Sequence, residues 1–97
     1  MLQPVSGAQW QRVNGTAAGT TVVKAAPTVF YGVLIGQNKT GTVTFYDNAT
    51  GTSATSLMTN VDNTSGTRPL FVPIGAQMKK GLVAEVGGTT DMLVIYQ

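Results

Sequence analysis

The chain has 97 residues, with six basic and four acidic side chains, no histidine and no cysteine. This length suits one domain, because two would each be too small to bury a core unaided. The composition excludes disulfides, and it removes the histidine and cysteine groups on which most acid–base, nucleophilic and zinc chemistry depends.

In chain order, short β-rich runs alternate with clusters of turn residues, which is typical of a sandwich or barrel. Residues 1–19 are the least regular part and are expected to be an N-terminal arm, within which residues 9–13 could form a short strand. Residues 20–97 are expected to form the sandwich domain. Its strands are predicted over residues 21–25, 28–37, 42–47, 54–60, 69–73, 76–79, 82–86 and 92–96.

The strand over residues 28–37 is apolar on both faces, so it is expected to lie centrally in a sheet, with glycines that leave room for a large neighbour or mark a bend. The next strand, over residues 42–47, alternates, with Val43 and Phe45 inward and Tyr46 outward. The turn between these two strands predicts that they pair as a hairpin.

Three further expectations concern the second half of the chain. Leu57 is expected in the core, and the prolines that bound residues 69–73 predict an edge strand there. In the strand over residues 82–86, Leu82, Ala84 and Val86 should share one face and Glu85 should lie on the other, because side chains alternate along a strand.

These elements predict an all-β fold: a single compact antiparallel β-sandwich of about eight strands, with a loose N-terminal segment. An up-and-down barrel and a jelly roll both remain open, and the jelly roll is favoured because strands near both ends are apolar on both faces. Two Asp-Asn-x-x-Gly segments, at residues 47–51 and 62–66, are predicted turns, since Asp and Asn bond the nearby backbone.

No catalytic constellation is visible, so the chain is expected not to be an enzyme and to need no cofactor. The four carboxylates, three of them in or beside predicted turns, are Asp47, Asp62, Glu85 and Asp91. A serine nucleophile would lack a base other than lysine. Calcium could use either Asp-Asn turn, but a good site needs more carboxylates, so no metal residue is assigned.

Nucleic acid and membrane are not expected as partners. The net charge is +2, but the basic residues are scattered rather than gathered in a stripe. No apolar run approaches the roughly 18 residues of a membrane helix, and the first residues do not resemble a signal peptide. Charged residues make up only 10 % of the chain, and a neutral polar surface favours contact with other surfaces.

Three places are candidates for partner contacts. In chain order they are the N-terminal arm, the turn after residue 46, and a set of positive side chains. Trp10 either lids the core or anchors a partner, because Trp and Arg are typical interface hot spots. The candidate contact residues are Gln9, Trp10, Arg12, Asn48, Thr50, Arg68, Lys79 and Lys80.

Residues 22–96 resemble a family of small structural proteins of tailed bacteriophages. The resemblance is carried by Tyr31-Gly32-Val33-Leu34, by residues 41–52 (GTVTFYDNATGT), by Lys80-Gly81-Leu82 and by Gly87-Gly88-Thr89 before the last strand. It implies a virion component without catalytic residues: a capsid decoration (cement) protein, a head-fibre base or a small tail-associated protein.

The expected function is therefore a non-enzymatic virion protein that binds the outer surface of the capsid. It would be made in the host bacterial cytoplasm, bind the major capsid protein or another virion protein, and assemble as a homotrimer. The alternatives are a carbohydrate-binding or adhesin-type module and a pilin-like subunit.

Overall fold

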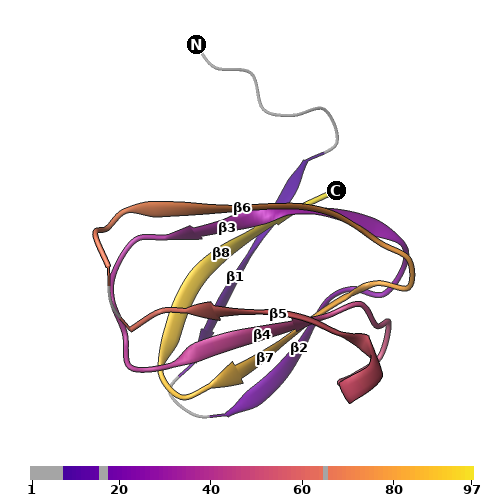
Figure 1. The fold of residues 1–97 in the computed structure, drawn as a ribbon, viewed down its shortest axis with the longest axis horizontal. Coiled ribbons are helices and arrows are strands. Elements are labelled where there is room, and N and C mark those ends of the chain that lie inside the picture. The colour runs from indigo at the N-terminus through magenta and orange to yellow at the C-terminus, as the bar shows by residue number, and fades with distance from the viewer. Residues whose placement is uncertain (1–7, 16–17, 65) are drawn as a thin grey trace.

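The structure is a computed structural model of the whole chain, and it describes residues 8–15, 18–64 and 66–97. Two four-stranded antiparallel sheets form the two layers of a sandwich (Figure 1). The first sheet has the strand order β1-β8-β3-β6 and the second has the order β2-β7-β4-β5. The strands are β1 (Gln9–Gly15), β2 (Gly19–Lys24), β3 (Thr28–Ile35), β4 (Thr42–Tyr46), β5 (Leu57–Asp62), β6 (Leu70–Met78), β7 (Leu82–Gly87) and β8 (Thr90–Tyr96).

The strand pairing is nested: β1 pairs with β8, β2 with β7, β3 with β6 and β4 with β5. This is the pattern of a long hairpin rolled into two sheets, which is the jelly-roll arrangement. The prediction of an antiparallel β-sandwich of eight strands is confirmed, and of the two open topologies the jelly roll is the one found.

The core lies between the two sheets and is built from side chains that alternate along each strand. Phe30 of β3 and Phe45 of β4 meet at its centre with ring centroids 4.8 Å apart. Val43, Leu82 and Ala84 are fully buried, as their alternation predicts. The core therefore uses both sheets equally and leaves each sheet one outer face.

The expected hairpin between residues 28–37 and 42–47 is wrong. These strands, β3 and β4, belong to different sheets, and residues 36–41 carry the chain from one layer to the other. Two backbone bonds hold that crossing: Lys39 N donates to Asn63 O over 2.7 Å, and Asn63 N donates to Gly41 O over 3.2 Å. The turn residues reverse the chain, but the partners of β4 are β5 and β7.

The boundary expected at residue 19 does not separate an arm from the sandwich in the described residues. Gln9–Gly15 forms β1, which pairs with β8 along its whole length, and Val13 lies in the core. An arm over residues 1–7 lies outside the described residues. The chain segment that bears Trp10 is thus an edge strand of the first sheet.

One side-chain orientation differs from expectation. Tyr46 points away from the core cluster as predicted, although it is buried, whereas Leu57, expected in the core, is 57 % exposed. The cause is a bulge in the pairing of β4 with β5, where Tyr46 faces Leu57 and the intervening Met58 turns toward the core. One extra residue in a strand moves every later side chain to the other face.

The β6 strand confirms the predicted edge position, since it lies at one end of the first sheet. It is one strand over Leu70–Met78 rather than two pieces, and it passes through Pro73 and a Gly75 with a positive φ of 66°. A proline and a left-handed glycine both fit an edge strand, because no second neighbour needs the missing donor.

Candidate functional site

The outer face of the first sheet carries two rows of apolar side chains. Cross-strand register places Trp10, Ile95, Gly32 and Pro73 in one row, and Arg12, Leu93, Leu34 and Phe71 in the next. We call Trp10, Pro73, Ile95, Leu34, Leu93 and Phe71 together the apolar face. All six are at least partly exposed, and Trp10 is 72 % exposed.

Gly32 leaves space for the Phe71 ring on the apolar face. A Cβ atom on Gly32 would lie 2.6 Å from the Cζ atom of Phe71 and 2.4 Å from the carbonyl oxygen of Val72. The glycine therefore leaves room for a large neighbour, as its position in a central strand predicted. It also sits at the bulge where β3 shifts its register against β6 and β8.

An ion pair borders the apolar face on the β1 side. Arg12 Nε and Nη2 donate to the two carboxylate oxygens of Asp91 over 2.8 and 2.7 Å. This two-point bond lowers the pKa of Asp91 below its ordinary value, against the opposing effect of burial, and the charge of Lys39 adds to the lowering. It also raises the pKa of Arg12. The pair fixes the orientation of both side chains.

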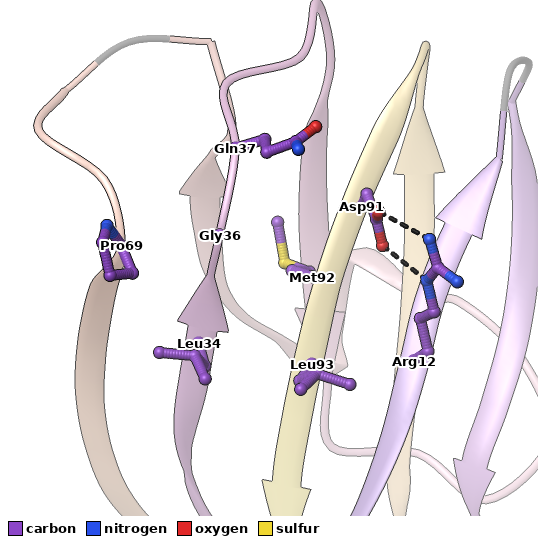
Figure 2. Close-up of a pocket in the computed structure, with 8 residues that line it drawn as sticks. All are labelled: Arg12, Leu34, Gly36, Gln37, Pro69, Asp91, Met92 and Leu93. Carbon is purple, nitrogen blue, oxygen red and sulfur yellow. Dashed lines mark hydrogen bonds and ion pairs between the residues drawn. The ribbon is translucent and has the colours of Figure 1, made fainter.

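A hollow of about 450 Å³ opens at one end of the apolar face, where β3 and β8 separate. Leu34 and Leu93 lie side by side at its lower end, and Asp91 and Arg12 form one wall (Figure 2). Met92 contributes to its floor and Pro69, which follows a cis peptide bond, to its far side. The hollow is thus mainly apolar with one charged rim.

Asn63 connects the chain after β3 to the start of β8 at the point where the two strands separate, which we call the fork. Its Nδ2 donates to the carbonyl oxygen of Gln37 over 2.9 Å, and its Oδ1 accepts from Asp91 N over 2.8 Å. The side chain is fully buried, so it replaces the ladder bonds that β3 and β8 no longer make to each other. Asn63 is therefore a structural clamp rather than a calcium ligand.

The other Asp-Asn turn uses its first residue instead. The Asp47 carboxylate accepts backbone N–H bonds from Lys79, Lys80 and Gly81, the tight turn between β6 and β7. Burial raises the pKa of Asp47, but the three N–H donors and the charge of Lys80 outweigh it and leave that pKa below its ordinary value. Asn48 caps its own turn, accepting from Thr50 N and Gly51 N, and its Nδ2 donates to Ser56 Oγ over 3.4 Å.

The candidate contact residues do not form one cluster. Trp10 and Arg12 lie on the outer side of β1, whereas Asn48, Thr50, Lys79 and Lys80 meet at the β6–β7 end through Asp47. Arg68 precedes β6 at the opposite end and donates to Asn38 Oδ1 over 2.6 Å. Arg68 and Lys79 lie at opposite ends of the nine-residue strand β6, so roughly 25 Å separates them. Gln9, at the start of β1, is exposed.

Sequence reasoning missed most of the apolar face. The strand over residues 28–37 is indeed central, since β3 lies between β8 and β6. However, apolar character on both faces suggested shelter on both sides, and no third layer covers the first sheet within the described residues. β8, which pairs with β3, also has apolar side chains on both faces. That repetition was the signal in the sequence that could have revealed the apolar face.

Among the described residues no three metal-ligating side chains gather at one place, and none of the helices is long and apolar enough to cross a bilayer. Comparison with protein-family models, with curated proteins and with solved structures finds no match to this chain.

Proposed function

We propose that this chain is a non-enzymatic structural protein of a tailed-bacteriophage virion, a capsid decoration (cement) protein that binds the outer surface of the shell through its apolar face. The observation that supports it is the uncovered pair of apolar rows on the first sheet. The largest exposed apolar patch on a typical monomer, roughly 300–600 Å², is often a functional surface. The resemblance to phage structural proteins supplies the kind of partner, the major capsid protein or another virion protein.

The state of the ionisable side chains supports a role without chemistry. Asp47 accepts three backbone donors, Asp91 is bonded at both oxygens by Arg12, and Glu85 accepts from the Tyr46 hydroxyl. Carboxylates engaged in this way stabilise the native structure rather than wait for a substrate. A binding role also fits a chain in which only 10 % of residues are charged, because little charge must be desolvated on contact.

The size of the face favours binding by several linked copies. Four strands of about seven residues give the whole outer face of the first sheet, of which the apolar face is a part, a footprint of roughly 450 Å² from ordinary strand spacings, about half of the ~800 Å² per partner in a standard interface. Linked copies bind far more tightly than one, since the later contacts become intramolecular. We therefore propose a homotrimer on the virion surface, made in the bacterial cytoplasm.

The test is rebinding of purified protein to shells from which it has been removed. Trp10→Ala should weaken rebinding by at least about 30-fold, the effect of losing an aromatic hot spot worth about 2 kcal/mol. The matched control is Leu57→Ala, which removes an exposed large side chain from the outer face of the second sheet and should change rebinding less than about twofold. Equal rebinding of the Trp10 variant and the unmodified protein would sink the proposed surface.

A carbohydrate-binding or adhesin-type role is the second candidate. Its motivation is the 72 % exposure of Trp10 beside Arg12 on the same strand face, since an exposed indole offers a flat surface for a sugar ring. A glycan array probed with the purified chain distinguishes the two functions. No bound glycan, together with retained shell binding, favours decoration.

A further inference from the structure

One asparagine of the chain is followed by glycine, at Asn14-Gly15. In such a pair the backbone nitrogen of the glycine can attack the side-chain amide carbon of the asparagine, because glycine has no Cβ atom to crowd the approach. The other four asparagines precede lysine, alanine, valine and threonine: they are Asn38, Asn48, Asn60 and Asn63. The sequence therefore makes Asn14 the asparagine most open to this attack.

The side-chain contacts separate Asn14 from the other asparagines in the same way. Each of the other four donates a hydrogen bond through its Nδ2 atom, over 2.7 to 3.4 Å. The Asn14 side chain is exposed and makes no hydrogen bond within the described residues. An asparagine side chain must turn onto its own backbone before the attack, and Asn14 can do so without breaking a native hydrogen bond.

The backbone at Asn14 has a neighbour on one side only. Asn14 and Gly15 are the last two residues of β1, an edge strand, and they pair with Asp91 and Thr90 of β8. Ring closure requires Asn14 to leave the extended conformation of the strand. The fraying ends of elements open at free energies far below that of global unfolding. Opening of these last two pairs therefore gives the attack its geometry while the sandwich stays folded.

We propose that Asn14 is a site of spontaneous deamidation, with water as the only co-reactant. The Gly15 nitrogen loses its proton and forms a bond to Asn14 Cγ, the Cγ–Nδ2 bond breaks, and ammonia leaves with that proton. The resulting succinimide ring joins the two residues. Water then opens the ring at either of its carbonyl carbons, which gives aspartate in one case and isoaspartate in the other.

Both products alter the end of β1. A carboxylate at position 14 reduces the net charge of +2 by one. It also lies opposite Asp91 in the strand register, where it competes with that carboxylate for Arg12. Isoaspartate in addition inserts a carbon atom into the main chain, so Gly15 can no longer keep its pairing with Thr90. Deamidation therefore loosens the part of β1 that holds the ion pair at the border of the apolar face.

The test is prolonged incubation of the full chain in neutral buffer, followed by trypsin digestion and mass spectrometry. Trypsin cuts after Arg12 and Lys24, and Asn14 is the only asparagine of the peptide 13–24. This peptide should convert into aspartate and isoaspartate forms. The peptide 25–39, whose only asparagine is Asn38, is the internal control and should stay unchanged. Aspartate without isoaspartate would mean direct hydrolysis of the side-chain amide and would overturn the ring-closure route.

A comparison with the unfolded chain in urea tests the contribution of the fold. The conversion rate of Asn14 in the native protein should lie within about a hundredfold of the rate in urea, which corresponds to a local opening of at most about 2.7 kcal/mol. A slowing beyond that limit would mean that the end of β1 opens only with the whole sandwich, and the inference would be wrong.

Two variants and a control assign the reaction to this pair. Gly15→Ala should slow the conversion severalfold in native buffer and in urea, because the added methyl group crowds the attacking nitrogen. Asn14→Gln should abolish it, because closure would need a larger ring. Gly19→Ala is the matched control: its added Cβ atom would meet nothing within 4 Å, and the rate should not change. An unchanged rate in Gly15→Ala would contradict the proposal, whatever the outcome of the shell-binding experiments.

Discussion

On the outer face of the second sheet, Tyr46 Oη donates to Glu85 over 2.9 Å and Asn60 Nδ2 donates to Thr44 Oγ1 over 2.7 Å. Polar side chains there satisfy one another across the strands. The face also has one apolar row, which is formed by Val22, Val83, Tyr46 and Leu57. Val83, on the middle strand β7, is fully buried. The end members of that row, Val22 and Leu57, are exposed.

The outer face of the first sheet is different in kind. Two of its rows are apolar, its largest side chain is the most exposed large hydrophobic group among the described residues, and its one ion pair stands at the border rather than across the centre. Both sheets shield the same core, so core packing does not require this difference. The first sheet therefore carries more exposed apolar surface than core packing needs, and this excess is what the proposed docking role would use.

The largest expected effect concerns the clamp that supports the first sheet at the fork. Asn63→Ala should lower the free energy of unfolding by about 2–4 kcal/mol, because it removes a fully buried amide and leaves the part-buried Gln37 carbonyl and Asp91 N–H without their partner. The control is Asn48→Ala in the equivalent turn, where the turn caps and one long bond to Ser56 are lost and the cost should stay near about 1 kcal/mol. Urea denaturation of both variants measures the difference, and equal costs would contradict the clamp.

The same glycine substitution on each outer face sharpens the comparison. Gly32→Ala should cost about 1–3 kcal/mol through overpacking, because the new methyl group meets Phe71 and the Val72 carbonyl oxygen. Gly87→Ala, on the second sheet, places its methyl 3.5 Å from Thr42 Oγ1 and should change stability by less than about 0.5 kcal/mol. Thermal unfolding of the two variants measures both, and a harmless Gly32→Ala would contradict the packing described for Phe71.

The two faces should lose stability at opposite ends of the pH scale. The pKa of Asp91 is lowered, so its contribution is present above the ordinary value of 3.8 and is lost as pH falls through the lower folded value. The pKa of Tyr46 is raised, first by its hydrogen bond to Glu85, so its contribution is present below the ordinary value of 10.0 and is lost as pH rises.

Unfolding free energies measured across the pH range test these signs. Asp91→Asn should flatten part of the acid limb and leave the alkaline limb unchanged, and Tyr46→Phe should do the reverse. Asp47, whose pKa is also lowered, contributes to the acid limb in both variants. A Tyr46→Phe variant with an altered acid limb and an unaltered alkaline limb would overturn the assignment.

The smallest stability effect should come from the most exposed side chain. Trp10→Ala should change the free energy of unfolding by no more than about 0.5 kcal/mol, because the indole makes few contacts within the sandwich. Calorimetry checks this, and a loss above 2 kcal/mol would mean that Trp10 covers the core after all.

Sequence alone predicted local structure well and long-range pairing poorly. Alternation located the strands and the inward side chains Val43, Phe45, Leu82 and Ala84, since period-two patterning is a local property. It did not reveal that β3 and β4 lie in different sheets, because a turn sequence reverses the chain without choosing a partner. The bulge that exposes Leu57 likewise arises from pairing with β4.

The two Asp-Asn turns show the same limit at the level of single side chains. In the first turn, Asp47 reaches a distant backbone and Asn48 caps locally; in the second, Asp62 caps Thr64 N locally and Asn63 reaches across the fork. The local sequences are nearly alike. Their roles differ because the partners come from segments more than twenty residues away, which turn chemistry cannot identify.

The most direct test of the central claim is the copy number of this chain in purified virions of its source, relative to the major shell protein. The account predicts a ratio near one or a fixed simple fraction of it, as expected for a protein spread over the capsid surface. A few copies per particle, or none, would contradict the decoration role.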